Sequence, residues 1–187
     1  MRVIAGKYKG RNIISPSHGE VRPTTDMVKG SLFSILESRG VVNNASCLDI
    51  FCGSGALGIE ALSRGADSCV FLDKDTFNAQ KNLDKIGISQ RMIRADFKQG
   101  LRLLRGEKFD IIFCDPPYKT DFGEAALGLV FRYGLLADDG IIIIEHNREK
   151  RLINAPNDCI IDRREFGITA LEIITRGKHE GDNSGSV

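Results

Sequence analysis

Residues 47–58 read CLDIFCGSGALG, a short apolar run followed by three closely spaced glycines. The run has the length and composition of a buried β-strand, and Gly53, Gly55 and Gly58 complete a GxGxxG pattern where the strand would pass into a helix. Glycines at such a turn allow a tight backbone and let N–H groups approach a ligand closely. The stretch therefore predicts a strand, a glycine loop and a helix, which together begin an α/β sheet. Alternatively, the glycines form only a tight structural turn.

Downstream, apolar runs alternate with amphipathic segments along most of the chain. The predicted strands are residues 47–51, 68–72, 92–95, 109–114 and 140–145, and the predicted helices are residues 57–64, 76–86, 97–104 and 122–133. Strands that are apolar on both faces and alternate with helices form parallel sheets covered by helices on both sides. Two final runs, 160–166 and 168–175, are separated by Gly167 alone, which leaves no room for a crossover helix. These two runs must therefore pair antiparallel.

A small basic segment precedes this alternation. Runs at residues 2–5 and 11–14 flank a glycine-bounded turn and predict a β-hairpin, and RPTTD at residues 22–26 predicts the start of a helix. Residues 1–30 contain six Lys and Arg side chains against two acidic ones, although the whole chain carries 26 Lys and Arg against 25 Asp and Glu. The segment is interpreted either as a solvated hairpin or as an arm that contacts the phosphates of a nucleic acid.

Length and composition exclude several other classes of protein. The 187 residues, 42% of them hydrophobic, suit one well-cored domain with a small appendage. We predict a basic N-terminal part at 1–45, a main domain at 46–176 and a disordered tail at 177–187. No apolar run approaches the roughly 18 residues of a membrane span and no signal peptide is recognisable, so a cytoplasmic location is expected. The five cysteines form no CxxC pattern, so neither disulfides nor a metal site is expected, and Cys52 and Cys114 have no assigned role.

Carboxylates near the glycine loop indicate which cofactor it would bind. Asp73 ends the second predicted strand, where its carboxylate can accept hydrogen bonds from both hydroxyls of an adenosine ribose. Asp49 precedes the loop, where it would repel the phosphates of a dinucleotide but attract the ammonium group of S-adenosylmethionine. Asp96 can accept from the adenine amino group with Phe97 beside the ring, or it can cap the following helix. The predicted cofactor-binding residues are Asp49, Phe51, Gly53, Ser54, Gly55, Asp73, Asp96 and Phe97.

The tetrapeptide DPPY at residues 115–118 follows the fourth predicted strand, at the edge where ligands bind in open α/β sheets. Pro116 and Pro117 lack N–H donors, so the loop presents acceptors, which suits a planar exocyclic amine. We hypothesise that Asp115 and the Pro116 carbonyl hold the amine, while Tyr118 stacks on the base that carries it. Alternatively, the tetrapeptide is a turn that ends a strand and exposes a tyrosine.

In combination, these motifs resemble the RsmD family of class I S-adenosylmethionine-dependent methyltransferases. The resemblance covers residues 1–176 and rests on the basic hairpin, the RPTTD helix start, the glycine loop with its helix, and DPPY. It implies a Rossmann-like sheet of seven mostly parallel strands whose last strand is antiparallel, with helices on both faces. It further implies methyl transfer to the N2 amine of a guanine in bacterial small-subunit (16S) rRNA, either naked or in a ribonucleoprotein assembly intermediate.

The resemblance also implies that the basic segment is an RNA-binding arm. The implied RNA-binding residues are Lys7, Lys9, Arg11, Arg22 and Lys29. Two sites depart from the family pattern, because Met27 replaces a common arginine and Gly30-Ser31 replaces a pair with higher helix propensity. Lys29 can supply the basic contact that Met27 lacks.

Two alternative functions use the same motifs. An adenine-N6 DNA methyltransferase shares the DPPY chemistry, but such enzymes usually carry a target-recognition insertion, and we recognise none in this sequence. A non-catalytic module that binds RNA or a nucleotide would keep the fold without transferring a methyl group.

Overall fold

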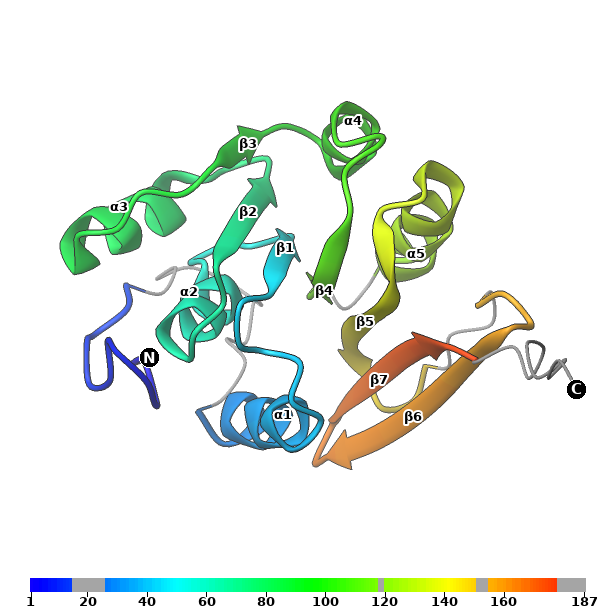
Figure 1. The fold of residues 1–187 in the computed structure, drawn as a ribbon, viewed down its shortest axis with the longest axis horizontal. Helices are drawn as coiled ribbons and strands as arrows, with labels where there is room; N and C mark the ends of the chain where they lie inside the picture. Colours follow the sequence, from blue (N-terminus) through cyan, green and yellow to red (C-terminus); the bar gives the residue numbers. More distant parts are fainter. Residues whose placement is uncertain (15–25, 118–119, 151–154, 178–187) are drawn as a thin grey trace, which may run out of the picture.

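A sheet of seven strands forms the centre of the protein (Figure 1). The structure, a computed structural model, describes residues 1–14, 26–117, 120–150 and 155–177. The strands are β1 (Ser46–Ile50), β2 (Ser68–Asp73), β3 (Met92–Arg94), β4 (Phe109–Cys114), β5 (Leu136–Asn147), β6 (Cys159–Phe166) and β7 (Thr169–Arg176). Their order is β3-β2-β1-β4-β5-β7-β6, and β7 runs antiparallel to both neighbours whereas the other pairs are parallel. The predicted sheet with an antiparallel last strand is therefore confirmed.

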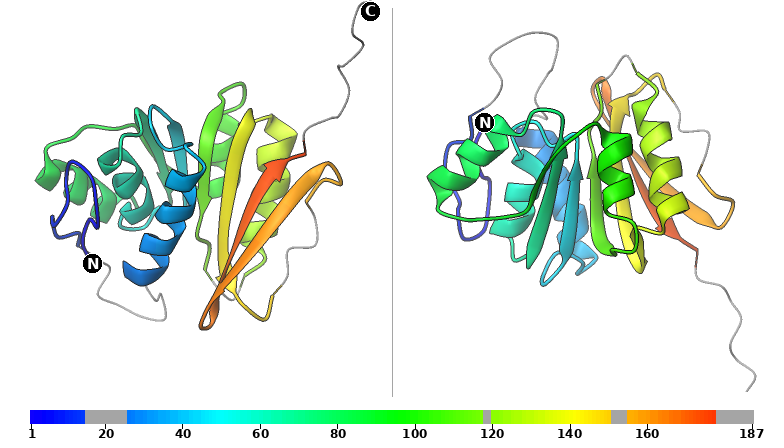
Figure 2. Two further views of the ribbon diagram at one scale, coloured as in Figure 1. Left: turned by 60° about the horizontal axis from the view of Figure 1, so that its bottom comes forward. Right: turned by 90° about the horizontal axis from the view of Figure 1, so that it is seen from above.

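Helices cover both faces of this sheet. The described helices are α1 (Asp26–Ser38), α2 (Ala56–Ser63), α3 (Phe77–Ile86), α4 (Phe97–Leu103) and α5 (Phe122–Tyr133). Buried side chains of α1, α2 and α3 join one hydrophobic cluster, and those of α4 and α5 join another on the opposite face (Figure 2). In β4, Ile111 and Phe113 belong to the first cluster and Ile112 and Cys114 to the second. This alternation follows from the two-residue period of a strand, and it explains why the run is apolar throughout.

The bounds of β6 and β7 differ from the predicted ones by one residue, and those of β5 differ more. β5 begins at Leu136, not at residue 140, and its register with β4 shifts between Phe109 and Ile111. The exposed Asp138 and Asp139 lie in this first part of β5. The sequence prediction relied on a continuous apolar run. It therefore missed the first part of β5, where two acidic residues are exposed.

A two-residue turn joins β6 to β7. Phe166 pairs with Thr169, so Gly167 and Ile168 form the turn, and Gly167 has a φ of 61°. Glycine adopts this left-handed conformation without a Cβ clash, which suits the first position of a two-residue hairpin turn. The single glycine thus accounts for the antiparallel pair that the sequence predicts.

Residues 1–14, which we call the N-terminal arm, fold back on themselves. Arg2 and Asn12 form an isolated antiparallel bridge, and Val3 is hydrogen-bonded through its N–H to Arg11 and through its carbonyl to Gly10. The predicted β-hairpin is thus present as a single bridge instead of two strands. Val3 is also buried in the same cluster as α1 and α2.

Parts of three sequence predictions lie outside the described residues. These parts are residues 22–25 of the RPTTD helix start, Tyr118 of the DPPY loop, and the predicted tail from residue 178 onward. The predicted helix is confirmed from Asp26. In the described part of the chain, none of the helices is both long and apolar enough to span a membrane.

Candidate functional site

The glycine loop follows β1 and has a backbone conformation that leaves one side of the loop accessible. Gly53 and Gly55 have φ values of 51° and 75°, and Phe51 shares the left-handed region with a φ of 61°. A residue with a Cβ is strained in this region, and such strain concentrates at binding sites. Among the described atoms, the nearest to a Cβ added at Gly53 is the Phe51 carbonyl oxygen, 3.9 Å away. That side of the loop therefore faces space that a ligand can occupy.

Asp73, at the end of β2, holds the glycine loop. Its Oδ2 accepts a hydrogen bond from the Gly53 N–H at 2.9 Å, and its Oδ1 accepts one from the Asp75 N–H at 3.1 Å. The Cys52 N–H donates to the Leu72 carbonyl at 3.2 Å, so the loop continues alongside β2. A ligand over Gly53 would therefore meet a carboxylate whose position is already fixed.

Asp49 lies beneath the loop, in β1. Only 2% of the residue is exposed, and its Oδ2 accepts a hydrogen bond from the Gly58 N–H at 3.0 Å. Burial raises the pKa of Asp49 to about 7, against the opposing effect of the Gly58 hydrogen bond, and the negative charge of Asp73 raises it further. This carboxyl group therefore changes its charge close to neutral pH.

The structure shows Asp96 in its alternative role as a helix cap. Its Oδ1 accepts from the Lys98 N–H at 3.0 Å, and its Oδ2 pairs with Lys74 Nζ at 3.1 Å. The hydrogen bond from Lys98, followed by the contact with Lys74, lowers the pKa of Asp96. Both oxygens thus have partners within the chain, and hydrogen bonding of Asp96 to adenine stays a prediction.

Phe97 is a core residue in the structure, and its place beside a bound ring stays a prediction. It is 3% exposed, and its ring centroid lies 5.1 Å from that of Phe51 and 5.2 Å from that of Phe122. Phe51 and Phe122 are half-buried and stack on each other at 6.2 Å. Phe51 therefore offers more ring surface at the glycine loop than Phe97 does.

The proline loop begins next to the glycine loop. The Asp115 N–H donates to the Ile50 carbonyl at 3.4 Å, so the residue after β4 lies beside the end of β1. Pro116 is buried, and its ring would contact a Cβ added at Gly123 of α5 at 3.3 Å. The Thr120 N–H and hydroxyl both donate to the Pro117 carbonyl, at 3.1 and 2.7 Å. Contacts on both sides thus fix the position of the described part of the loop.

Cysteine thiols flank both loops but are buried. Cys52 and Cys114 are 6% and 3% exposed, and burial raises the pKa of both thiols above its ordinary range. A thiol that stays protonated is a poor nucleophile. The two side chains therefore fill space in the core on either side of the sheet.

Three predicted RNA-binding residues, Lys7, Lys9 and Arg11, are exposed on the N-terminal arm. Arg22 lies outside the described residues. Lys29, in contrast, is wrong as a direct RNA contact, because its side chain is fully buried. Its Nζ lies 3.2 Å from Glu60 Oε2 and donates to the Arg2 carbonyl at 2.7 Å. Burial lowers the pKa of Lys29, and the carboxylate of Glu60 opposes this shift.

Glu60 anchors the arm, a role that our sequence analysis missed. This buried α2 residue accepts hydrogen bonds from the Ile4 N–H at 2.8 Å and the Ala5 N–H at 3.0 Å, and it also pairs with Arg64 at 2.8 Å. An available signal was its position within the apolar helix sequence ALGIEALS, where a carboxylate must be buried. The sequence does not reveal which backbone groups it binds.

Asn82 joins the arm to the glycine loop and was also missed. Its amide exchanges hydrogen bonds with Ile14, accepting from the N–H at 2.8 Å and donating to the carbonyl at 3.0 Å. The same amide donates to the Ser54 carbonyl at 2.8 Å. Asn82 is 1% exposed, so this connection is shielded from water. The end of the arm is therefore fixed at the proposed cofactor site.

Within the described residues, no group of three or more His, Cys, Asp or Glu side chains could hold a metal ion. Of the predicted cofactor residues, Asp73 and Asp49 accept hydrogen bonds from backbone N–H groups of the glycine loop and of α2. These two residues and Asp115, whose N–H is bonded to the Ile50 carbonyl, lie at the carboxyl ends of three adjacent strands, β2, β1 and β4.

Comparison with known proteins agrees with this architecture. The chain is 39% identical over 182 residues to YlbH of Bacillus subtilis, whose name describes a candidate rRNA methyltransferase, with 92% of this chain and 97% of YlbH covered. It is 33% identical over 168 residues to ribosomal RNA small subunit methyltransferase D of Escherichia coli, covering 88% and 84% of the two chains. The solved structure of yhhF from Escherichia coli superimposes with a TM-score of 0.82 at 33% identity, covering 95% of this chain and 98% of that one. The model for the family described as conserved hypothetical protein 95 matches residues 1–175, and the chain therefore belongs to this family of RsmD-type methyltransferases.

Proposed function

We propose that this protein transfers a methyl group from S-adenosylmethionine to the N2 amine of a guanine in small-subunit rRNA. The observation that carries the proposal is the hydrogen bond from the Asp115 N–H to the Ile50 carbonyl at 3.4 Å, which places the proline loop beside the glycine loop. An acceptor-lined loop next to a cofactor loop suits transfer to an amine. Membership of the RsmD-type family supports the same substrate class.

The residues around the glycine loop fit the proposed cofactor. Gly53 faces open space, Asp73 offers a fixed carboxylate to the ribose hydroxyls, and Asp49 offers a negative charge to the ammonium group. When bound, S-adenosylmethionine supplies a methyl group made electrophilic by its positively charged sulfur. The half-buried ring of Phe51 borders the same loop and shields one side of it. The carboxylates of Asp73 and Asp49 are hydrogen-bond acceptors, which match the hydroxyl and ammonium groups of an amino acid joined to adenosine.

The proline loop orients the target amine. Asp115 and the Pro116 carbonyl accept hydrogen bonds from the two amine protons, so that the nitrogen lone pair faces the glycine loop. A guanine amine is a weak nucleophile because it is conjugated with the ring, so alignment must contribute a large part of the rate. Positioning of this kind can contribute roughly 7 to 11 kcal/mol. Asp115 or water takes the proton that the nitrogen loses, and Tyr118 stacks on the base.

The N-terminal arm binds the RNA around the target. Lys7, Lys9 and Arg11 are exposed, so they can neutralise backbone phosphates. A target base in a duplex must be flipped out of the stack to reach the proline loop. The substrate is naked rRNA or an assembly intermediate, and the cytoplasm is the proposed location.

Methyl transfer from labelled S-adenosylmethionine tests this proposal. The purified protein is incubated separately with 16S rRNA, with small ribosomal subunits that lack methylation and with unmethylated DNA, and each digested nucleic acid is analysed by mass spectrometry. We expect labelled N2-methylguanosine at a single position. Labelled N6-methyladenosine in DNA would instead identify an adenine methyltransferase. Cofactor binding without transfer to any RNA would identify a non-catalytic module.

A further inference from the structure

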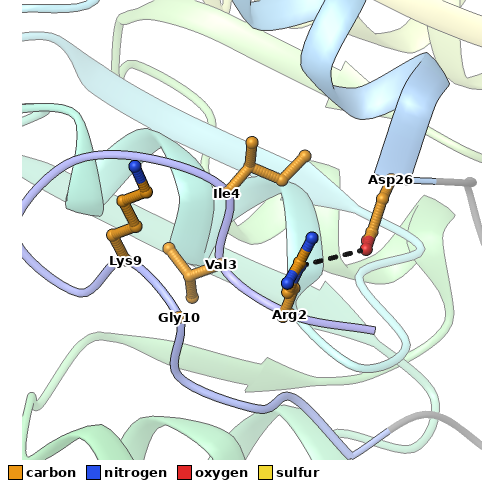
Figure 3. Close-up of a pocket in the computed structure, with 6 residues that line it drawn as sticks. All are labelled: Arg2, Val3, Ile4, Lys9, Gly10 and Asp26. Carbon is orange, nitrogen blue, oxygen red and sulfur yellow. Dashed lines mark ion pairs between the residues drawn. The ribbon is translucent and has the colours of Figure 1, made fainter.

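A cavity of about 300 Å³ opens on the N-terminal arm (Figure 3). Its lining residues are Arg2, Val3, Ile4, Lys9, Gly10 and Asp26. Lys9 stands at one end and the Arg2–Asp26 pair at the other, with Val3 and Ile4 between them (Figure 3). The volume lies at the lower limit of sites that hold small ligands, and it combines charged ends with an apolar middle.

The wall of this cavity is held from behind by a fully buried ion pair. Lys29 Nζ donates to the Arg2 carbonyl at 2.7 Å, and Glu60 accepts from the Ile4 N–H at 2.8 Å. Lys29 and Glu60 themselves lie 3.2 Å apart with no exposed side-chain surface. The Gly10 N–H donates to the Val3 carbonyl at 2.9 Å, which closes the other side. The backbone around the cavity is therefore preorganised, and a ligand need not order it.

The charged groups at the mouth are accessible and only loosely paired. Arg2 Nε and Asp26 Oδ2 lie 3.7 Å apart, and their side chains are 69% and 44% exposed. An exposed ion pair at this distance is weak and can rearrange around a ligand. Lys9 is also exposed. The cavity thus offers two cations and one carboxylate to a ligand from solution.

We propose that this cavity binds one nucleotide of the RNA substrate, with its phosphate on Lys9 and its ribose 2′-hydroxyl on Asp26. A carboxylate repels phosphate but accepts a hydrogen bond from a hydroxyl, so the end with Asp26 suits the sugar. The half-buried side chain of Ile4 offers apolar surface to the face of the sugar and base. The 2′-hydroxyl distinguishes RNA from DNA, so this contact selects RNA. The inference rests on the proposed function, because it takes the substrate to be RNA.

The position of the cavity supports this role. Ile14, at the end of the arm, is fixed by Asn82, which also donates to the Ser54 carbonyl in the glycine loop at 2.8 Å. The arm that carries Arg2 and Lys9 is thus anchored directly at the proposed cofactor site. A nucleotide held in the cavity would restrain the segment of RNA that leads to the target base.

Interference mapping with 2′-deoxynucleotides tests the contact to Asp26. 16S rRNA carrying about one random 2′-deoxy phosphorothioate nucleotide per molecule is bound to the wild-type protein or to Asp26→Ala, and the bound RNA is cleaved with iodine. Interference marks the nucleotides at which loss of the 2′-hydroxyl weakens binding. We expect one of these nucleotides to lose its effect with Asp26→Ala while the others keep theirs. Asp139→Ala, which removes an exposed carboxylate of β5, should keep every position. Unfolding midpoints and cofactor affinity verify that the variants are folded.

The outcomes separate this inference from the proposed function. If the wild-type protein methylates rRNA but Asp26→Ala keeps the full interference pattern, the inference about the cavity is wrong and the proposed function stands. If the wild-type protein neither binds nor methylates rRNA, both are overturned.

Charge neutralisation tests the contact to Lys9. Lys9→Gln should weaken binding of 16S rRNA about three- to tenfold and lower the slope of log affinity against log salt by about one. Arg105→Gln removes one exposed positive charge after α4 and serves as the matched control. Equal losses in the two variants would contradict a specific phosphate contact at Lys9.

Discussion

Asp49 combines burial with a proposed positively charged partner, so its protonation affects both stability and binding. Its pKa of about 7 lies above the ordinary value of 3.8 because burial disfavours the charged form. The folded protein therefore holds this proton more tightly than the unfolded chain does. Without cofactor, the contribution of Asp49 to the free energy of unfolding should fall as pH rises from about 4 to about 7.

Cofactor affinity should change with pH in the opposite direction. The ionised form of Asp49 attracts the ammonium group, so S-adenosylmethionine should bind more weakly as pH falls below about 7, with a total loss of about tenfold. Isothermal titration calorimetry between about pH 5.5 and about pH 7.5 measures this dependence. Asp49→Asn should bind about tenfold more weakly at the higher pH and show little dependence. A wild-type affinity that does not change with pH would contradict the role of Asp49.

Asp115 should affect catalysis much more than cofactor binding. Asp115→Ala removes an acceptor that aligns the amine, so we expect kcat for methyl transfer to fall about 100-fold or more. Cofactor affinity should stay within about threefold, because Asp73 and Asp49 are unchanged. Asp121→Ala, which removes a 93% exposed carboxylate shortly after the same loop, is the matched control. Loss of cofactor binding in Asp115→Ala would show that the two loops do not divide these tasks.

At the scale of elements, Gly58 determines how closely α2 packs on β2. A Cβ at this position would lie 2.5 Å from the Phe71 ring and 2.6 Å from Cys69 Sγ. Gly58→Ala should therefore lower the free energy of unfolding by about 1 to 3 kcal/mol in urea titrations. Gly128→Ala in α5 adds the same methyl group where the described atoms leave open space, and it should be neutral or stabilising. Equal effects would mean that helix propensity, and not packing, determines stability at Gly58.

Glu60 holds together α1, α2 and the N-terminal arm. Glu60→Ala leaves Lys29 buried without its carboxylate and frees the N–H groups of Ile4 and Ala5. We expect the free energy of unfolding to fall by about 3 to 5 kcal/mol and trypsin to cleave the arm faster. Glu107→Ala breaks an exposed ion pair with Arg91 and should lower the free energy of unfolding by less than about 1 kcal/mol. A similarly small loss in Glu60→Ala would show that the arm is held mainly by its apolar side chains.

For the whole molecule, local sequence patterns predict the sheet but not the partners of its polar groups. Apolar runs that alternate with helices are enough for the parallel strands, and Gly167 is enough for the last pair. Lys29 shows the limit of an inference from charge, because its spacing from Leu32, Phe33 and Leu36 places it on the buried face of α1. The ion pair with Glu60 joins segments far apart in the sequence, and periodicity contains no information about such pairs.

In the candidate site, too, local sequence patterns predict the backbone turns but not the partners of the polar side chains. The GxGxxG pattern encodes the turn of the glycine loop, and the structure shows that Asp73, 20 residues after Gly53, accepts a hydrogen bond from the Gly53 N–H. Asp96 lies where the prediction puts it, but Lys98 and Lys74 engage its two oxygens. Asn82 was missed because its partners, Ile14 and Ser54, come together only in the folded chain. The sequence thus predicts where backbone turns form, and the structure shows which side chains form hydrogen bonds or ion pairs between elements.

The proposed methyl transfer depends on a target amine held by the proline loop beside a cofactor on the glycine loop. The most direct test maps N2-methylguanosine in 16S rRNA from cells that lack this protein and from the same cells supplied with the wild-type chain or with Asp115→Ala. We predict that one guanine loses its methyl group in the deletion, regains it with the wild-type chain and stays unmethylated with Asp115→Ala. An rRNA methylation pattern that is identical in all these cells would contradict the proposed function.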